Sequence, residues 1–151
     1  MPVPSDMTDA ERNAMVAVAR AHVAAERVAD VDATMATLDD DPTYELQPMN
    51  VVLRGRSVAR RYYEHFFAIC RPRIRRSELR SEWITDRGVL HEYVLHVDEP
   101  DGTTTRHHLV AVLEFGAGRL SGERLYAGDA LLRMMFGPVL DGLDSAELKS
   151  R

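Results

Sequence analysis

The hydrophobic pattern of this chain changes its period near Ile74, and that change limits the folds it can adopt. Before Ile74, apolar residues recur every three or four positions, which is typical of helices with one buried face. After Ile74, apolar and polar residues alternate, which is typical of half-buried β-strands. Helices followed by strands predict an α+β domain with the helices gathered on one face of the sheet.

The first expected helix begins at a capping-box pattern, in which Thr8 and Glu11 each satisfy a free backbone N–H. It runs from residue 8 to about 29, with His22 on its buried stripe. A short helix from Asp32 should end in the aspartates before Pro42, and residues 43–52 are expected to be extended or irregular. A third helix follows Gly55 and ends at Arg71–Pro72, because proline disfavours a helical predecessor. The last helix is expected from Asp129 to Gly137.

Turn signals divide the second half at residues 86–88, 99–102 and 116–118. They predict antiparallel strands near 74–85, 89–98, 103–115 and 119–127. Strands of this length coil strongly, so the sheet should curve into a trough. The predicted fold is a cone-shaped α+β barrel, in which three to four helices cover a curved antiparallel sheet and enclose an elongated cavity.

Length and composition predict one domain in a reducing compartment. The 151 residues suit a single core, expected at about 8–137, with 138–151 as a flexible tail. Cys70 is the only cysteine, which excludes an intramolecular disulfide and a cysteine zinc site. The N-terminus lacks the pattern of a secretory signal, so we expect a soluble, cytoplasmic protein. A net charge of −5 argues against nucleic-acid or membrane partners, and we interpret the arginines at 71–76 as a solvated crossover.

The stretch from His22 to Asp129 resembles the SnoaL-like branch of the nuclear transport factor 2-like superfamily. The residues that carry the resemblance are 22–26, 41–48, 53–63, 115–126 and Asp129. The superfamily includes ketosteroid isomerases, polyketide cyclases, scytalone dehydratase, limonene epoxide hydrolases and non-catalytic domains, so the fold alone does not decide the chemistry.

The resemblance also shows where this chain departs from its relatives. Gln47 and Val110 fall where ketosteroid isomerases have aspartates, and neither side chain can perform their proton transfer. Leu125 falls at the aspartate of polyketide cyclases. Tyr63 matches a tyrosine of the isomerase hydrogen-bond network, and His22 falls near the tyrosine that donates to the oxyanion.

Glu123 is the predicted proton-transfer residue. A two-residue turn at Ala117–Gly118 would pair His108 with Ala127, Val110 with Leu125 and Val112 with Glu123, and cross-strand partners share one face. The resemblance places Val110 and Leu125 toward the cavity, so His108 and Glu123 should face it too. A carboxylate among apolar side chains has a raised pKa, which suits general acid or base catalysis. The alternative is a structural ion pair with an arginine.

His22 and His108 are the other predicted catalytic residues, which would orient or polarise the substrate. Glu26, one helical turn after His22, can hold its imidazole in one tautomer. Alternatively, His22 is a hydrogen-bonded core residue. The side chains expected to bind substrate are Tyr44, Gln47, Tyr63, Tyr93, Val110 and Leu125, and the tyrosines can instead be core residues.

The sequence therefore predicts an acid–base enzyme of isomerase, cyclase, dehydratase or hydrolase type that acts on a small, largely apolar organic ligand. The alternative is a non-catalytic ligand-binding or dimerisation module. No cofactor is implied, because the chain has neither GxGxxG nor a P-loop. No metal is expected either, since no histidine pair has a zinc-protease spacing, although zinc would suit a histidine–carboxylate set. We expect a homodimer through an outer sheet strip of Leu109, Ala111, Leu113 and Tyr126.

Overall fold

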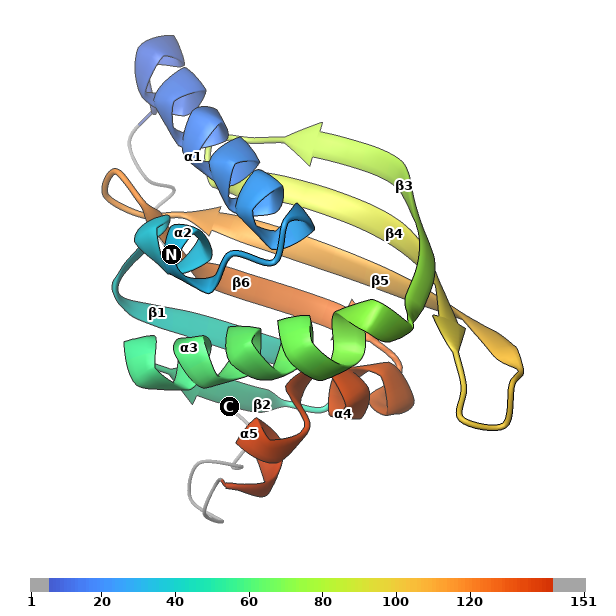
Figure 1. Ribbon diagram of the computed structural model, residues 1–151. Helices are drawn as coiled ribbons and strands as arrows, with labels where there is room; N and C mark the ends of the chain where they lie inside the picture. The colour runs from blue at the N-terminus through green and yellow to red at the C-terminus, as the bar shows by residue number, and fades with distance from the viewer. Residues whose placement is uncertain (1–5, 143–151) are drawn as a thin grey trace.

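The computed structural model describes residues 6–142, in which helices cover one face of a curved sheet (Figure 1). Helix α1 (Asp9–Arg27) begins at the predicted capping box: Glu11 N–H donates to Thr8 Oγ1, and Thr8 N–H donates to the Glu11 carboxylate. Helix α2 (Val31–Ala36) is short. Helix α3 (Arg56–His65) continues into a π-helical turn, η1 (Phe66–Cys70), and a 3-10 turn, η2 (Arg71–Arg73). Helices α4 (Asp129–Phe136) and α5 (Pro138–Asp141) follow the last strand.

The sheet has the strand order β2-β1-β6-β5-β4-β3. Its strands are β1 (Leu38–Gln47), β2 (Val51–Arg54), β3 (Ile74–Ile84), β4 (Gly88–Asp98), β5 (Thr104–Phe115) and β6 (Leu120–Ala127). This arrangement confirms the predicted α+β cone, and β3 to β6 form the expected meander.

The sheet is mixed rather than antiparallel, because β1 pairs in parallel with β6. The aspartates that we expected to end a helix already belong to β1. Since α2 ends at Ala36, Thr37 reaches the sheet edge, and its carbonyl accepts the N–H of Leu120 over 2.9 Å. The chain therefore enters β1 alongside the start of β6.

The predicted orientation of the β5 side chains is wrong, because β6 contains a β-bulge. Near the turn the expected register holds, with Phe115 opposite Leu120, but Glu114 then pairs with Gly122, so Ser121 is an extra residue. Beyond the bulge the partners shift by one, and Glu123 lies opposite Leu113 instead of Val112. Bulges change which side chains of the partner strand share a face with their own.

As a result, His108 and Val110 lie on the outer face of the sheet and not in the cavity, contrary to the prediction. His108 is exposed, and Val110 pairs with Tyr126, which is 44% exposed. The predicted dimer strip fails for the same reason, because Leu109, Ala111 and Leu113 are buried under the helices. A homodimer stays a prediction, with exposed Trp83 and Tyr126 as apolar side chains of the outer face.

The end of the described chain is packed rather than loose. Helix α5 buries Val139 and Leu140, whereas a flexible tail was expected from residue 138. The remainder of that expected tail, 143–151, lies outside the described residues. Among residues 6–142, no helix combines the length and the apolar character that a membrane span requires.

Replacing Gly122 tests the bulge. This glycine has φ +142°, and an added Cβ would lie 1.8 Å from the Thr43 carbonyl oxygen. Gly122→Ala should therefore disrupt the β1–β6 contact and cost more than about 3 kcal/mol of unfolding free energy, measured by urea denaturation. Gly118→Ala is the matched control: its φ is +83° but nothing lies within 4 Å, so only backbone strain of about 1–2 kcal/mol is expected. Equal losses in the two variants would contradict a steric role for Gly122.

Candidate functional site

His22 is the centre of the candidate site. It lies on the stripe of α1 that faces the sheet, and its side chain is fully buried. A buried imidazole needs a hydrogen-bond partner at each ring nitrogen. Here the partners come from different parts of the chain: the junction of α2 and β1, strand β6, and α1 itself.

Thr37 fixes the proton on Nδ1 of His22. The Thr37 hydroxyl donates its single proton to the Thr34 carbonyl over 2.7 Å. Its oxygen lies 2.6 Å from His22 Nδ1 and can only accept there, so Nδ1 carries a hydrogen. The junction is held by Arg56, whose guanidinium donates to the carbonyls of Met35, Leu38 and Asp39.

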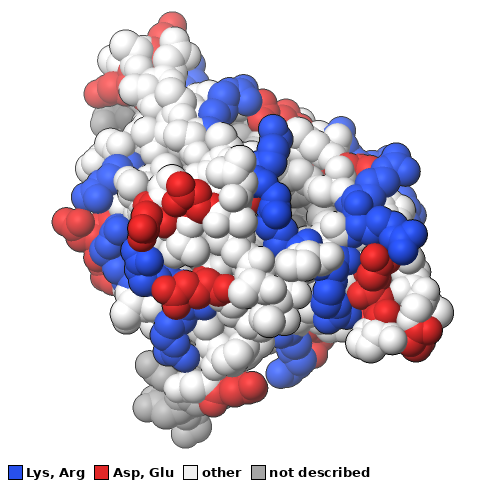
Figure 2. All heavy atoms as spheres, viewed as in Figure 1, with Lys and Arg blue, Asp and Glu red and all other residues white. Residues whose placement is uncertain are grey.

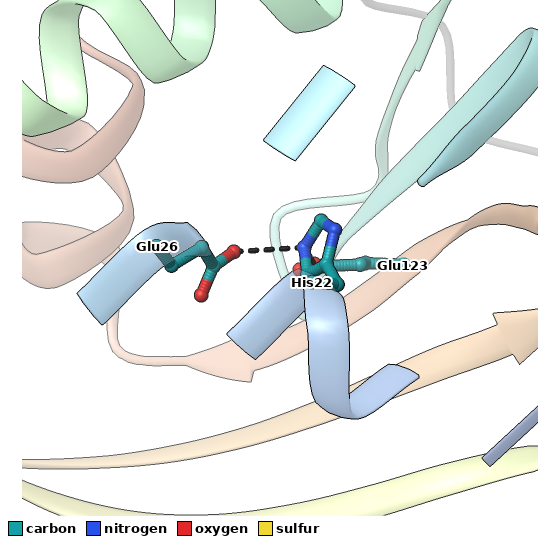
Figure 3. A group of neighbouring side chains, drawn as sticks. All are labelled: His22, Glu26 and Glu123. Atoms are coloured by element: carbon teal, nitrogen blue, oxygen red, sulfur yellow. Dashed lines mark hydrogen bonds and ion pairs between the residues drawn. The ribbon is translucent and has the colours of Figure 1, made fainter. Parts of the chain in front are cut away.

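Two carboxylates meet at the other ring nitrogen. His22 Nε2 lies 2.8 Å from Oε1 of Glu123 and 2.9 Å from Oε1 of Glu26 (Figure 3). Burial by itself would lower the pKa of His22, but the charge of Glu26 and the hydrogen bonds to both glutamates raise it to about 10. His22 therefore keeps both ring protons at neutral pH and shares its Nε2 proton between the carboxylates.

Glu123 is buried, as predicted, but its partner is not an arginine. Burial raises the pKa of this carboxyl, while the hydrogen bond from His22 acts in the opposite direction. Glu123 is 4% exposed and lines the cavity, so it can meet a ligand with little competition from water. A carboxyl with a raised pKa that faces a ligand cavity is a candidate for general acid or base catalysis.

A chain of tyrosines supports Glu123 from behind. The Tyr63 hydroxyl donates to Glu123 Oε1 over 3.4 Å, and lies 2.5 Å from the Tyr44 hydroxyl. Because the Tyr63 proton points to Glu123, Tyr44 is the donor between the two tyrosines. Burial raises the pKa of both phenols well above the usual value, so they remain neutral donors.

The cavity next to this network has a volume of about 720 Å³, within the usual range for small-molecule sites. It lies between α1 and strands β3 to β6, and Glu26 and Glu123 share its wall. A second polar group stands in the wall, where His91 Nε2 lies 2.7 Å from Glu82 and Arg20 pairs with the same carboxylate over 3.1 Å. Apolar side chains from every side complete the lining: Val16, Val23, Phe66, Leu79, Val89, Leu95, Leu109, Leu125 and Met135.

The structure brings together most of the site predicted from sequence. His22 and Glu123 are in contact, and Leu125 and Tyr93 line the cavity. Tyr44 and Tyr63 contribute through the hydrogen-bond chain rather than from the wall. Three predictions are wrong, because His108, Val110 and Gln47 lie on the outer face. Gln47 pairs with exposed Tyr126 and directly follows Leu46, whose side chain points inward.

Two contributors to the site were missed or undervalued. Glu26 was expected only to orient His22, but it also faces the cavity. The helical spacing from His22 could have indicated this role. Thr37 was not predicted at all, because nothing local marks a threonine between a helix and a strand as a partner of a distant histidine.

Cys70 adds no nucleophile, since burial raises its pKa to about 12.

The same atoms could also hold a metal ion. One ligand atom each from His22, Glu26 and Glu123 lies within 4.8 Å of the others. Histidine nitrogen and carboxylate oxygen are common zinc ligands. A cation here would replace the proton on His22 Nε2, because both occupy the space that the carboxylates surround.

Comparison of structures places this fold among known ones, although no family model and no curated protein matches the sequence. An NTF-2 like protein from Burkholderia xenovorans superposes with a TM-score of 0.59 at 20% identity, over 78% of this chain and 84% of that one. An NTF2-like protein from Cytophaga hutchinsonii gives 0.63 at 10% identity, over 76% and 99%. The chain has the NTF2-like fold. A third match, a hypothetical protein from Catenulispora acidiphila with a ketosteroid isomerase-like fold, was crystallised with trimethylamine (0.59, 14% identity, 82% and 94%).

Thr37→Val tests the anchoring of His22 in this NTF2-like site. Valine keeps the shape of threonine but cannot accept the Nδ1 hydrogen, which leaves a buried donor unpaired and should cost about 1–3 kcal/mol. The pKa of His22, followed by NMR, should fall because the charged imidazole loses a partner. Thr37→Ser retains the hydroxyl and should leave that pKa unchanged. A His22 pKa in Thr37→Val that is unchanged from the wild type would remove Thr37 from the site.

The raised pKa of His22 also predicts how stability varies with pH. Since the pKa rises from 6.5 to about 10 on folding, its proton stabilises the fold fully below pH 6.5. That contribution is lost as the pH rises through about 10. In urea denaturation, the stability difference between the wild type and His22→Gln should therefore shrink over this range. A difference that grows with pH would contradict a protonated His22.

Proposed function

We propose that this NTF2-like chain is an acid–base enzyme that binds a largely apolar organic molecule in its cavity and moves a proton within it. The reaction classes that we propose are isomerisation, cyclisation, dehydration and hydrolysis. The observation that carries the proposal is the position of Glu123, a buried carboxyl that shares a proton with His22 and lines the cavity. Solved proteins of similar fold include one described as ketosteroid isomerase-like.

In the proposed mechanism, Glu123 accepts a proton from the ligand and returns it to another ligand atom. His22 is held by Thr37 and keeps Glu123 oriented through the Nε2 hydrogen bond. Glu26 shares that Nε2 proton and also reaches the cavity, so a proton can pass between the two glutamates through His22. Tyr63 stabilises the charged form of Glu123 through its hydroxyl.

The alternative is a module of the same fold that binds a ligand without reaction. Such a module would suit a cavity plugged by Met134, Met135 and Phe136. Instead, Met135 forms one part of the wall, and Phe136 is stacked on Tyr62 with 4.0 Å between ring centroids. The open cavity and the converging His22, Glu26 and Glu123 therefore favour the enzyme.

Proton exchange between a ligand and the solvent tests the proposal across several substrate classes at once. The protein is incubated in D₂O with a panel of cyclic and aromatic ketones and enones, and deuterium entry next to the carbonyl is followed by NMR. We expect catalysed exchange by the wild type and a loss of about 10²-fold or more in Glu123→Gln, because an amide cannot accept the proton.

His108→Gln is the matched control, since this histidine lies on the outer face and should have no role. Unfolding of Glu123→Gln is measured in parallel; we expect a loss below about 2 kcal/mol, because the amide oxygen still accepts from His22 and Glu26 keeps its charge partner. Unchanged exchange in Glu123→Gln would exclude Glu123 as the proton-transfer group. Bound ketones that never exchange would support the non-catalytic module.

A further inference from the structure

Helix α1 presents two neighbouring stripes that differ in charge. Met15, Ala19, His22 and Glu26 face the sheet, and their spacing of three and four residues makes one stripe. The adjacent stripe, one residue further along the chain, is formed by Val16, Arg20, Val23 and Arg27, and all four line the cavity. The helix therefore places carboxylate and imidazole groups at one part of the cavity and guanidinium groups at another.

The facing wall is also basic. Arg71 in η2, with Arg75 and Arg76 in β3, lines the cavity opposite α1. Arg71 Nη2 donates to the backbone carbonyl of Arg27, so the two walls meet at the C-terminal end of α1. Figure 2 shows basic side chains over this part of α1 and beside the β3 edge. The arginine run at 71–76 is therefore part of the cavity wall and not only a solvated crossover.

Most of these arginines are neutralised by neighbours. Arg20 pairs with Glu82, Arg75 with Asp98, and Arg76 with Glu78. Among residues 6–142, Arg27 and Arg71 have no carboxylate within salt-bridge distance. The charge of Arg27 is felt inside the cavity: burial raises the pKa of Tyr93 to about 12, and Arg27 acts against that rise.

We propose that the ligand is an amphipathic organic anion, whose carboxylate, sulfonate or phosphate group is held by Arg27 and Arg71 while its apolar body lies in the cavity. This inference rests on the proposed function, and it names the substrate class. The anionic group would lie toward the C-terminal end of α1, and the reacting part toward Glu123. The reverse orientation would place the anionic group of the ligand beside the carboxylates of Glu26 and Glu123 in a poorly solvated space.

A pair of fluorescent probes with one skeleton tests the charge preference. Anilinonaphthalene sulfonate carries the anionic group, and N-phenyl-naphthylamine is the same molecule without it. The wild type should bind the sulfonate at least fivefold more tightly than the neutral probe. Added salt should weaken the binding of the sulfonate and leave that of the neutral probe unchanged. Arg27→Gln should lose about fivefold in sulfonate affinity and keep its affinity for the neutral probe.

Arg27→Lys and Arg133→Gln are the controls. Lysine keeps the positive charge and should restore most of the sulfonate preference. Arg133 lies on α4, is paired with Asp129 and does not line the cavity, so its loss should have no effect. Near-UV circular dichroism of each variant shows whether sulfonate fluorescence comes from the folded protein, because a molten globule binds this probe but loses its near-UV signal.

The outcomes separate this inference from the proposed function. Equal affinity of the wild type for the two probes, or equal losses of both in Arg27→Gln, would overturn the anion site and leave the acid–base proposal in place. Failure of both probes to bind the folded wild type would overturn the ligand cavity itself. Tight sulfonate binding that depends on Arg27, together with no exchange activity, would support the anion site in a non-catalytic module.

Discussion

The burial of one imidazole constrains the rest of this molecule. His22 lies where water cannot reach it, so the chain must supply partners for both nitrogens. Those partners join three separate segments: α1 through Glu26, the start of β1 through Thr37, and β6 through Glu123. The parallel pairing of β1 with β6 keeps the last two segments side by side. The helix layer is thus attached to the sheet through directional bonds as well as apolar contact.

The cavity combines two different electrostatic environments in one small domain. Its inner wall buries a carboxyl against apolar side chains, whereas its rim on α1 and β3 carries guanidinium groups. On α1, the acidic and the basic groups lie on adjacent stripes, whose residues are one position apart in the sequence. Among residues 6–142, no arginine pairs with Glu123, and the proton of His22 neutralises this carboxylate instead.

The sequence predicted the layers well because they depend on periodicity. The capping box, the helix stripes and the alternating strands are local patterns, and the structure confirms them. The face of each strand depends instead on two loops. The loop closed by Glu99 and Thr103 holds three residues, one more than a two-residue turn at Asp101–Gly102 would have, and β6 holds one extra residue at Ser121. The two register shifts cancel for Tyr93, Glu123 and Leu125 but leave β5 inverted, which explains why His108 and Val110 were misplaced.

The sequence predicted those parts of the site that depend on helix spacing and on strand alternation. His22 and Glu26 are one turn apart, and Glu123 follows from the strand pattern, so their convergence could be inferred. Thr37 depends on where α2 ends and on the carbonyls that Arg56 holds, which are tertiary facts. Local sequence carries no signal for such a contact.

The bulge at Ser121 gives this fold a route to new chemistry that needs no change of side chain. Side chains alternate across a strand, so adding or deleting one residue there exchanges the two faces of β5 relative to β6. Because β5 stays paired with β4, a single codon deletion at Ser121 would turn Glu123 and Leu125 outward and Arg124 and Tyr126 toward the ligand. Length variation at one position can in this way offer selection a differently lined pocket, while the helices and the order of strands are kept.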